Sequence, residues 1–157
     1  QRLCGCRATG NRQGIGLMYQ YKATITRIID GDTVDCDIDL GFSVTLTKQR
    51  IRLHGIDTPE SRTRDKVEKK YGLLAKQYLK DFIEKEDSHV LIETSKEKRG
   101  KFGRILGKLV NAGGVCVNDL MCETGHAVPY FGQSKEDIAA GHIANREIID
   151  RITDGTV

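Results

Sequence analysis

The order of the expected elements predicts an α+β fold, mainly β, in which a small closed barrel of five strands carries about three helices. Three segments that alternate apolar and polar residues precede the first helical pattern, and two more follow it. Three strands, a helix and two strands cannot build a doubly wound parallel sheet, because that sheet needs strands and helices in steady alternation.

The first three strands are expected over residues 21–29, 32–40 and 43–56, joined by turns at Gly31 and Gly41. Three antiparallel strands in succession form a meander. In the second strand the apolar residues, Cys36 among them, alternate with an acidic stripe. The stripe consists of Asp35, Asp37 and Asp39.

A helix is expected over residues 71–86, because apolar side chains recur at helical spacing there. Strands follow over 89–94 and 104–110, then a short helix over 117–123 that ends before Gly125. Ser134 is the expected N-cap of a last helix. A five-stranded barrel with helices packed on it is the oligonucleotide-binding fold (OB-fold), whose strands and loops commonly hold nucleic acid.

Residues 1–19 contain four glycines and no periodicity, so we interpret them as an N-terminal arm outside a single domain of residues 20–157. The net charge of +3 is uneven: residues 61–108 carry 14 Lys/Arg against 8 Asp/Glu, and residues 109–157 carry 3 against 7. A basic middle beside an acidic tail suits a polyanion on one face, or simply a solvated helix and loop. No apolar run approaches the ~20 residues of a membrane span, so no membrane partner is expected.

The five cysteines form no Cys-x-x-Cys pair. Cys36 is expected to pack as a small apolar residue, and Cys4 and Cys6 alone make a poor zinc or disulfide signature. The cysteine content and the lack of a visible signal peptide favour an intracellular location.

Two acidic clusters end alternating segments: residues 30–34 read Asp-Gly-Asp-Thr-Val, and residues 52–60 read Arg-Leu-His-Gly-Ile-Asp-Thr-Pro-Glu. A meander can bring Asp32 and Asp57 to one end of a barrel. Two carboxylates and a backbone carbonyl would leave room for water around a hard cation such as calcium. The alternative is that residues 30–32 only form a hairpin turn.

Arg52 and Arg104 are candidate phosphate ligands. Alone, each is an ordinary surface charge, but two guanidiniums can clamp a phosphate and stabilise transition-state charge. Glu60 is either an exposed loop acid or a group that activates water. Tyr130 offers a ring face to a base, or packs. The four histidines are scattered singly, and we interpret all of them as structural or surface residues.

Four segments, taken in order, resemble motifs of the staphylococcal nuclease (thermonuclease) family. They are residues 29–34, residues 52–60, Tyr71-Gly72 and the Lys-Phe-Gly-Arg sequence at 101–104. The resemblance covers roughly residues 22–130. It implies an OB-fold barrel and a calcium-dependent nuclease that hydrolyses DNA and RNA with broad specificity and leaves 3′-phosphate ends. Single-stranded or frayed regions would be favoured, and a monomer is expected.

The resemblance also implies roles for residues at matching positions. The expected metal ligands are Asp32, Asp57 and the carbonyl of Thr58, with Asp30 reaching the Ca²⁺ through water. The expected catalytic residues are Arg52 and Arg104 on the phosphate, and Glu60 as general base or water-orienting group. The expected substrate-binding residues are Lys101 and Tyr130.

The chain departs from the family pattern at Phe102, where the best-known member has a tyrosine, and in the loop before Tyr130, which is one residue shorter. The alternative function is a non-catalytic nuclease-like module that binds nucleic acid or protein. Such a module has no need of the full set of expected active-site residues. That set is Asp32, Arg52, Asp57, Glu60 and Arg104.

Overall fold

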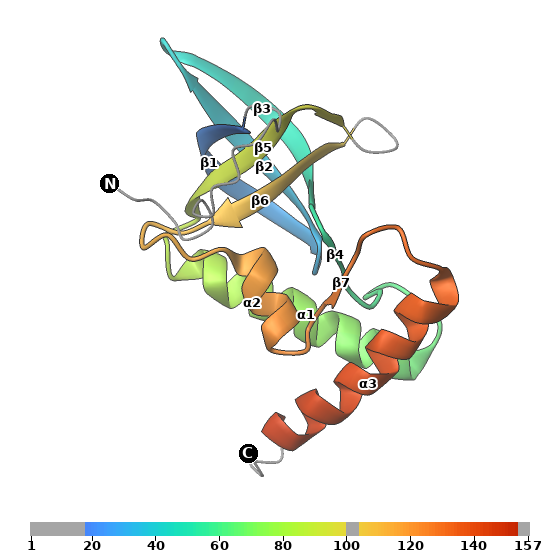
Figure 1. The fold of residues 1–157 in the computed structure, drawn as a ribbon. Helices are drawn as coiled ribbons and strands as arrows, with labels where there is room; N and C mark the ends of the chain where they lie inside the picture. The colour runs from blue at the N-terminus through green and yellow to red at the C-terminus, as the bar shows by residue number, and fades with distance from the viewer. Residues whose placement is uncertain (1–17, 100–103, 154–157) are drawn as a thin grey trace.

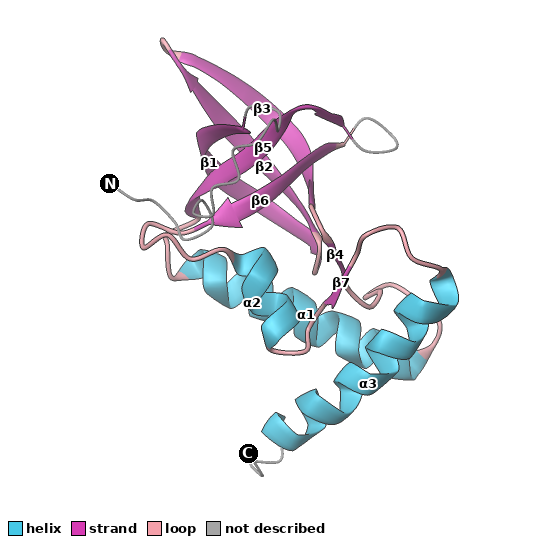
Figure 2. Ribbon diagram, viewed as in Figure 1, coloured by secondary structure: helices cyan, strands magenta, loops and turns pink. Residues whose placement is uncertain are grey.

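The computed structural model describes residues 18–99 and 104–153, and its strands form a closed five-stranded barrel with the helices gathered at one end (Figures 1 and 2). The order around the barrel is β1-β2-β3-β6-β5. These strands are β1 (Met18–Asp30), β2 (Thr33–Gly41), β3 (Val44–Leu53), β5 (His89–Arg99) and β6 (Ile105–Val110). The predicted α+β class and the OB-like barrel are confirmed. Residues 1–17 of the expected arm, with Cys4 and Cys6, lie outside the described residues, and β1 already includes residues 18 and 19.

The first three strands form the predicted antiparallel meander. Ile25 lies opposite Cys36 between β1 and β2, and Val34 lies opposite Ile51 between β2 and β3. The apolar side chains of the alternation point into the barrel, where Val34, Cys36 and Ile51 are fully buried. Cys36 therefore packs as predicted, and burial raises the pKa of its thiol to about 12.

Strand β6 closes the barrel by pairing antiparallel with β5 and parallel with β3. Ile105 lies opposite Ile51, and Leu106 lies opposite Arg52. The register brings Arg104, which directly precedes β6, to the part of β3 that carries Arg50 and Arg52. The sequence did not predict this parallel pairing, because the alternation of apolar and polar residues marks a strand but not the strand that it pairs with.

The expectation of an unbroken third strand from 43 to 56 is wrong. Strand β3 ends at Leu53, and the chain turns at Gly55, whose φ of 80° is in the left-handed region that glycine adopts without steric cost. Ile56 and Asp57 then form β4, which pairs with β7 (Val128–Pro129) in a separate two-stranded sheet. The turn carries Asp57 out of the barrel wall and towards the helices (Figure 1).

The first helix, α1 (Lys66–Glu84), begins five residues before the predicted position. Asp65 is its N-cap: Oδ1 accepts hydrogen bonds from the backbone N–H groups of Val67 and Glu68 at 2.9 and 3.2 Å. An aspartate before a helical stretch is a recognisable start signal, and the polar composition of residues 57–70 concealed it.

The other two helices begin where the sequence predicts. Helix α2 (Val117–Glu123) has the expected bounds, and α3 (Lys135–Thr153) follows Ser134, whose hydroxyl accepts the N–H of Asp137 at 3.1 Å. Asn118 of α2 is 1% exposed, and its side chain links α2 to the barrel by hydrogen bonds. Its amide donates to the His54 carbonyl at 2.8 Å and accepts from the Leu109 N–H at 3.3 Å.

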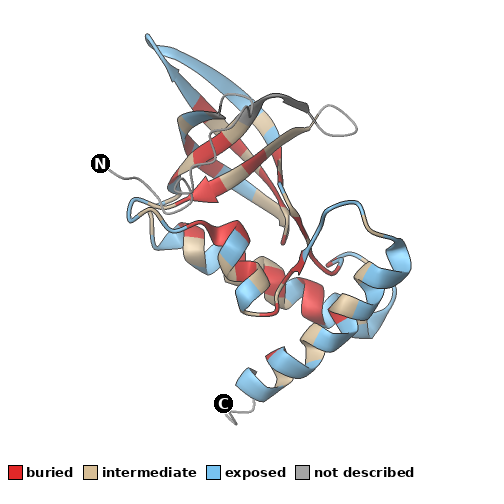
Figure 3. Cartoon of the chain, viewed as in Figure 1, coloured by how far each residue is buried: buried red, intermediate tan, exposed pale blue. Residues whose placement is uncertain are grey.

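The main core fills the barrel and continues between its lower end and α1 (Figure 3). Leu79 and Ala75 of α1 are fully buried against barrel residues such as Leu53 and Ile92. Cys36, Cys116 and Cys122 are free thiols. Within residues 18–99 and 104–153, no helix is both long and apolar enough to cross a membrane.

Gly72 sets the distance between α1 and the loop that follows β4. A Cβ added to Gly72 would lie 2.3 Å from the Glu60 carbonyl oxygen and 2.7 Å from the Ser61 nitrogen. Only a residue without a side chain permits this contact between helix and loop backbone.

We expect Gly72→Ala to lower the free energy of unfolding by about 1–3 kcal/mol, because overpacking against backbone outweighs the gain in helix propensity. Urea denaturation measures this change. Leu73→Ala is the matched control, since Leu73 is 47% exposed, and it should change stability by no more than about 0.5 kcal/mol. Equal stability of the two variants would contradict the tight contact.

Candidate active site

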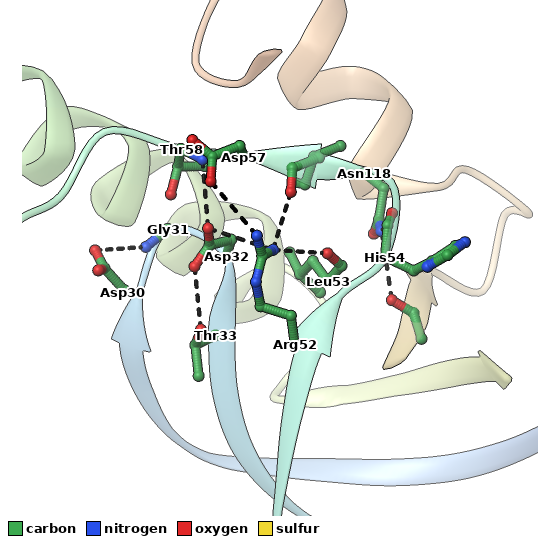
Figure 4. Close-up of polar contacts among 12 residues, drawn as sticks. Asp30, Gly31, Asp32, Thr33, Arg52, Leu53, His54, Asp57, Thr58 and Asn118 are labelled. Carbon is green, nitrogen blue, oxygen red and sulfur yellow. Dashed lines mark hydrogen bonds and ion pairs between the residues drawn. The ribbon is translucent and has the colours of Figure 1, made fainter. Parts of the chain in front are cut away.

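The two carboxylates predicted as metal ligands lie at the same end of the barrel, although they come from different strands (Figure 4). Asp32 lies in the turn between β1 and β2, and Asp57 lies in β4. The Asp32 carbonyl accepts the N–H of Leu53 at 2.8 Å, and Asp32 Oδ2 accepts the N–H of Thr58 at 3.3 Å. The hairpin turn is thereby attached to the segment that carries Asp57. The turn at residues 30–32 is therefore observed, and the role of Asp32 as a metal ligand stays a prediction.

The guanidinium of Arg52 lies between these carboxylates. Nη1 is 3.3 Å from Asp32 Oδ2, and Nη2 is 3.5 Å from Asp57 Oδ1. Nη1 also donates to the carbonyl oxygens of Leu53 and Ile56, both at 2.9 Å. The side chain is 17% exposed. Two backbone acceptors therefore hold the cation in one orientation, with part of it open to solvent.

Negative charge is in excess at this end of the barrel. The pKa of Asp32 is raised, mainly because burial disfavours its charged form; Arg52 opposes the shift, and the neighbouring Asp30 and Asp57 add to it. An acid that is costly to ionise beside two other carboxylates is an environment that a bound cation would stabilise.

His142 of α3 contacts one of the predicted site residues, a contact that the interpretation of the four histidines as structural or surface residues did not include. Its Nε2 is 2.9 Å from Asp57 Oδ2, and the residue is 9% exposed. Asp57 is thus held between Arg52 on one side and His142 on the other. No local signal marks His142, because the contact joins residues 85 positions apart.

Asp30 connects the carboxylates to a neighbouring cavity. Its Oδ1 accepts hydrogen bonds from the Ser61 hydroxyl at 2.8 Å and the Gly31 N–H at 3.0 Å. Asp30 and the half-buried Arg104 line the same cavity of about 840 Å³. Arg104 thus shares the cavity with Asp30, whereas Arg52 lies in the carboxylate cluster of Asp32 and Asp57.

Three further predicted site residues lie around this centre. Glu60 is exposed in the loop after β4, with its backbone against Gly72. Thr58 is buried, and its hydroxyl oxygen has no hydrogen-bond partner among the described residues. Tyr130 is 44% exposed, and its N–H donates to the Gly55 carbonyl at 2.8 Å, next to β4. Lys101, like Phe102, lies outside the described residues.

Asp32, Asp57 and the Thr58 carbonyl are oxygen donors, the type of ligand that a hard cation prefers. Within the described ranges, no cluster of three or more His, Cys, Asp or Glu side chains is arranged to hold a metal ion, so a metal site here stays a prediction. Both carboxylates face the guanidinium of Arg52. Calcium accepts such oxygen ligands and fills its remaining positions with carbonyl oxygens and water.

Comparison with known proteins identifies the family. Residues 50–147, more than half of the chain, match the family described as staphylococcal nuclease homologue. The chain belongs to this family. The resemblance noted in its motifs is therefore confirmed. Of the predicted site residues, the structure brings Asp32, Arg52 and Asp57 together.

Individual relatives are similar over parts of their length. Endonuclease YhcR of Bacillus subtilis (strain 168) is 27% identical over 117 residues, 71% of this chain and 9% of that protein. An uncharacterised protein of Bacillus anthracis is 33% identical over 107 residues, 68% of this chain and 46% of that protein. Thermonuclease of Staphylococcus intermedius is 33% identical over 82 residues, 52% of this chain and 44% of that protein. The chain thus spans less than half the length of each of these relatives.

The raised pKa of Asp32 makes a prediction about stability. A folded-state pKa above the unfolded value means that the folded protein binds the proton more tightly, so stability falls as pH rises through the folded pKa. Asp32→Asn removes this cost. Without added metal, its melting temperature should exceed that of the parent at pH 7, and the difference should shrink towards pH 4.

Thermal unfolding monitored by circular dichroism at pH 7 and pH 4 measures the effect. Glu147→Gln is the control, because Glu147 is 78% exposed, and it should change the melting temperature little at either pH. A melting temperature below that of the parent for Asp32→Asn at pH 7 would contradict the cost assigned to the charge.

Proposed function

We propose that this domain is a calcium-dependent nuclease that hydrolyses phosphodiester bonds of DNA and RNA with broad specificity and leaves 3′-phosphate ends. One observation carries the proposal: the guanidinium of Arg52 is fixed between Asp32 and Asp57 at the end of a barrel of nuclease-family fold. An oriented cation beside oxygen ligands for a metal is suited to a phosphodiester.

Asp32, Asp57 and the carbonyl of Thr58 would hold the calcium ion, with Asp30 reaching it through water. The acidic neighbours of Asp32 support the assignment: burial raises the pKa of Asp32 most, and Asp30 and Asp57 raise it further. Bound calcium would supply Lewis-acid polarisation of the phosphate. His142 would keep Asp57 oriented, as outer hydrogen bonds to metal ligands do.

Arg52 would grip a non-bridging oxygen of the scissile phosphate and stabilise the charge that accumulates in the transition state. Because hydrogen bonds to the Leu53 and Ile56 carbonyls already fix the guanidinium of Arg52, it would need little reorientation during the reaction. Arg104 would contact the same phosphate from the cavity that it shares with Asp30. The two guanidiniums together would form the clamp that neither forms alone.

Glu60 would accept a proton from the attacking water or orient it. The oxygen of that water bonds to phosphorus, and the bond from phosphorus to the 5′ oxygen breaks. The products are a 3′-phosphate and, once that oxygen is protonated, a 5′-hydroxyl. Glu60 suits this task because its side chain is exposed while its backbone is held against α1.

Lys101 and Tyr130 would bind substrate beyond the scissile group, Lys101 through phosphate and Tyr130 by stacking under a base. The names of two relatives, an endonuclease and a thermonuclease, support a nucleic-acid substrate. Single-stranded or frayed regions would be preferred, because stacking on an aromatic ring requires an unstacked base. A monomer is sufficient for every role proposed here.

The test of function is digestion of single-stranded DNA and RNA with calcium, with magnesium and with EDTA. We expect cleavage with calcium and none with EDTA, and 3′-phosphate ends on the products. Arg52→Ala and Arg104→Ala should each lower kcat/KM by about 10²- to 10³-fold, as loss of one group that stabilises transition-state charge does. Glu60→Ala should also be strongly impaired.

Lys80→Ala, an exposed change on α1, is the control and should retain parental activity. Arg104→Ala, Glu60→Ala and Lys80→Ala should unfold cooperatively near the parental temperature. Arg52→Ala should unfold at a lower temperature, because Asp32 and Asp57 lose the cation between them, so activities are compared well below that temperature. A folded parent that binds nucleic acid without cleaving it would instead establish the non-catalytic binding module.

Calcium binding can be tested apart from activity by isothermal titration calorimetry. Asp32→Ala should abolish measurable binding, and His142→Ala should raise the calcium Kd by about 10-fold or more, because Asp57 loses the group that orients it. His142→Gln, which keeps a donor, should recover part of the loss. His89→Ala, on the barrel surface, should bind calcium as the parent does; an unchanged Kd in His142→Ala would remove His142 from the site.

A further inference from the structure

The cavity that contains Arg104 extends from the candidate active site over the outer face of β1, β2 and β3. It has a volume of about 840 Å³, and none of the described residues that line it is aromatic. The charged lining residues among them are Arg27, Asp30, Asp35, Lys48, Arg50 and Arg104. Within the described part of the chain, four cationic side chains thus face two carboxylates in the cavity, whereas the adjoining cluster around Asp32 has an excess of carboxylates.

The arginines of the cavity are arranged by strand pairing. Arg27, Asp35 and Arg50 occupy directly opposed positions on the three strands. Arg50 donates to both oxygens of Asp35, from Nε at 2.7 Å and from Nη2 at 2.9 Å, and this hydrogen bonding lowers the pKa of Asp35. Two of the five N–H groups of Arg50 are thereby used, and three remain for another anion. Asp35 thus orients Arg50 and leaves it able to donate hydrogen bonds to an anion in the cavity.

Lys48 reaches the cavity from a distortion in β3. Gln49 pairs with Cys36, and Leu46 pairs with Ile38, so two residues of β3 lie opposite the single residue Asp37. Such a bulge redirects side chains next to functional sites. Lys48 has a φ of 55°, a conformation that is strained for any residue with a side chain, and Asp37 Oδ1 holds it by accepting its N–H at 2.9 Å. Glycine would adopt this conformation without strain, so a lysine here indicates a use for its ammonium group.

We propose that this cavity is a second phosphate-binding site, which takes the sugar–phosphate backbone of one nucleic-acid strand next to the phosphate held by Arg52 and Arg104. Lys48 and Arg50 are its main cationic groups, and Arg27 flanks them. The inference rests on the proposed function, because it assigns the path of that substrate.

Two observations favour a nucleic-acid backbone as the occupant. The cavity is continuous with the candidate active site through Asp30 and Arg104, so one strand can contact both. The described residues of its lining are mainly cationic and include no ring on which a base could stack, so this part of the cavity would contact phosphates and not bases. The site therefore adds affinity without sequence preference, in keeping with a nuclease of broad specificity.

Lys48→Gly is the decisive variant, because glycine suits the backbone of the bulge while the ammonium group is lost. Binding of a fluorescent single-stranded DNA oligonucleotide is measured by anisotropy in EDTA over a series of salt concentrations. We expect severalfold weaker binding and a slope of log K against log salt that is smaller by about 0.7, the value for one lost phosphate contact on a single strand. The melting temperature should equal or exceed that of the parent.

Lys48→Arg keeps a cation and should keep the parental slope. Ser88→Gly is the matched control for relief of backbone strain, since Ser88 has a φ of 64° outside the cavity; Lys80→Ala controls for loss of a lysine elsewhere. A parental slope in Lys48→Gly, or an equal loss in Lys80→Ala, would overturn the second site, and calcium-dependent cleavage by the parent would still stand. A folded parent that neither binds nor cleaves nucleic acid would overturn both the second site and the proposed function.

Discussion

The arrangement of the candidate site depends on the bonds that fix Arg52. Its guanidinium donates to the carbonyl oxygens of Leu53 and Ile56 and lies within 3.5 Å of Asp32 and Asp57. These contacts exist only because β3 ends at Leu53 and the chain turns at Gly55. One cationic side chain thus joins the end of β3, the β1–β2 turn and β4. The mostly buried charges are tolerable because they are paired and hydrogen-bonded.

The carboxylates of the site are only partly paired with cationic groups, so negative charge is in excess there. Asp32 and Asp57 share one fixed guanidinium, and Asp30 is a further acidic neighbour of Asp32. Burial, and then these acidic neighbours, raise the pKa of Asp32. The surrounding structure maintains this arrangement: Gly72 allows α1 to support the Glu60 loop, and His142 of α3 contacts Asp57. The unbalanced charge lowers the free energy of unfolding, and a bound cation would raise it again.

The acidic stripe on β2 has a structural role. Asp35 binds Arg50, Asp37 accepts the N–H of Lys48, and Asp39 accepts the N–H of Gly41 at 2.8 Å. Each carboxylate therefore stabilises the β2–β3 hairpin or its bulge. Asp35 also orients the guanidinium of Arg50, and Asp37 holds the backbone of Lys48, two residues that line the neighbouring cavity.

Sequence alone predicted the fold class, the meander, the N-cap of α3, and Asp32, Arg52 and Asp57 as candidates that the structure brings together. Each of these depends on local alternation or on short motifs, such as Asp-Gly-Asp-Thr-Val at 30–34, whose signals lie within a few positions. The tertiary structure decided the parallel pairing of β3 with β6, the transfer of Asp57 to β4, and the contact of His142 with Asp57. It also decided the position of Lys48 beside the cavity. These features depend on contacts between residues distant in the chain or on a single strained backbone angle. Neither a long-range contact nor a single angle produces a repeating pattern in the sequence.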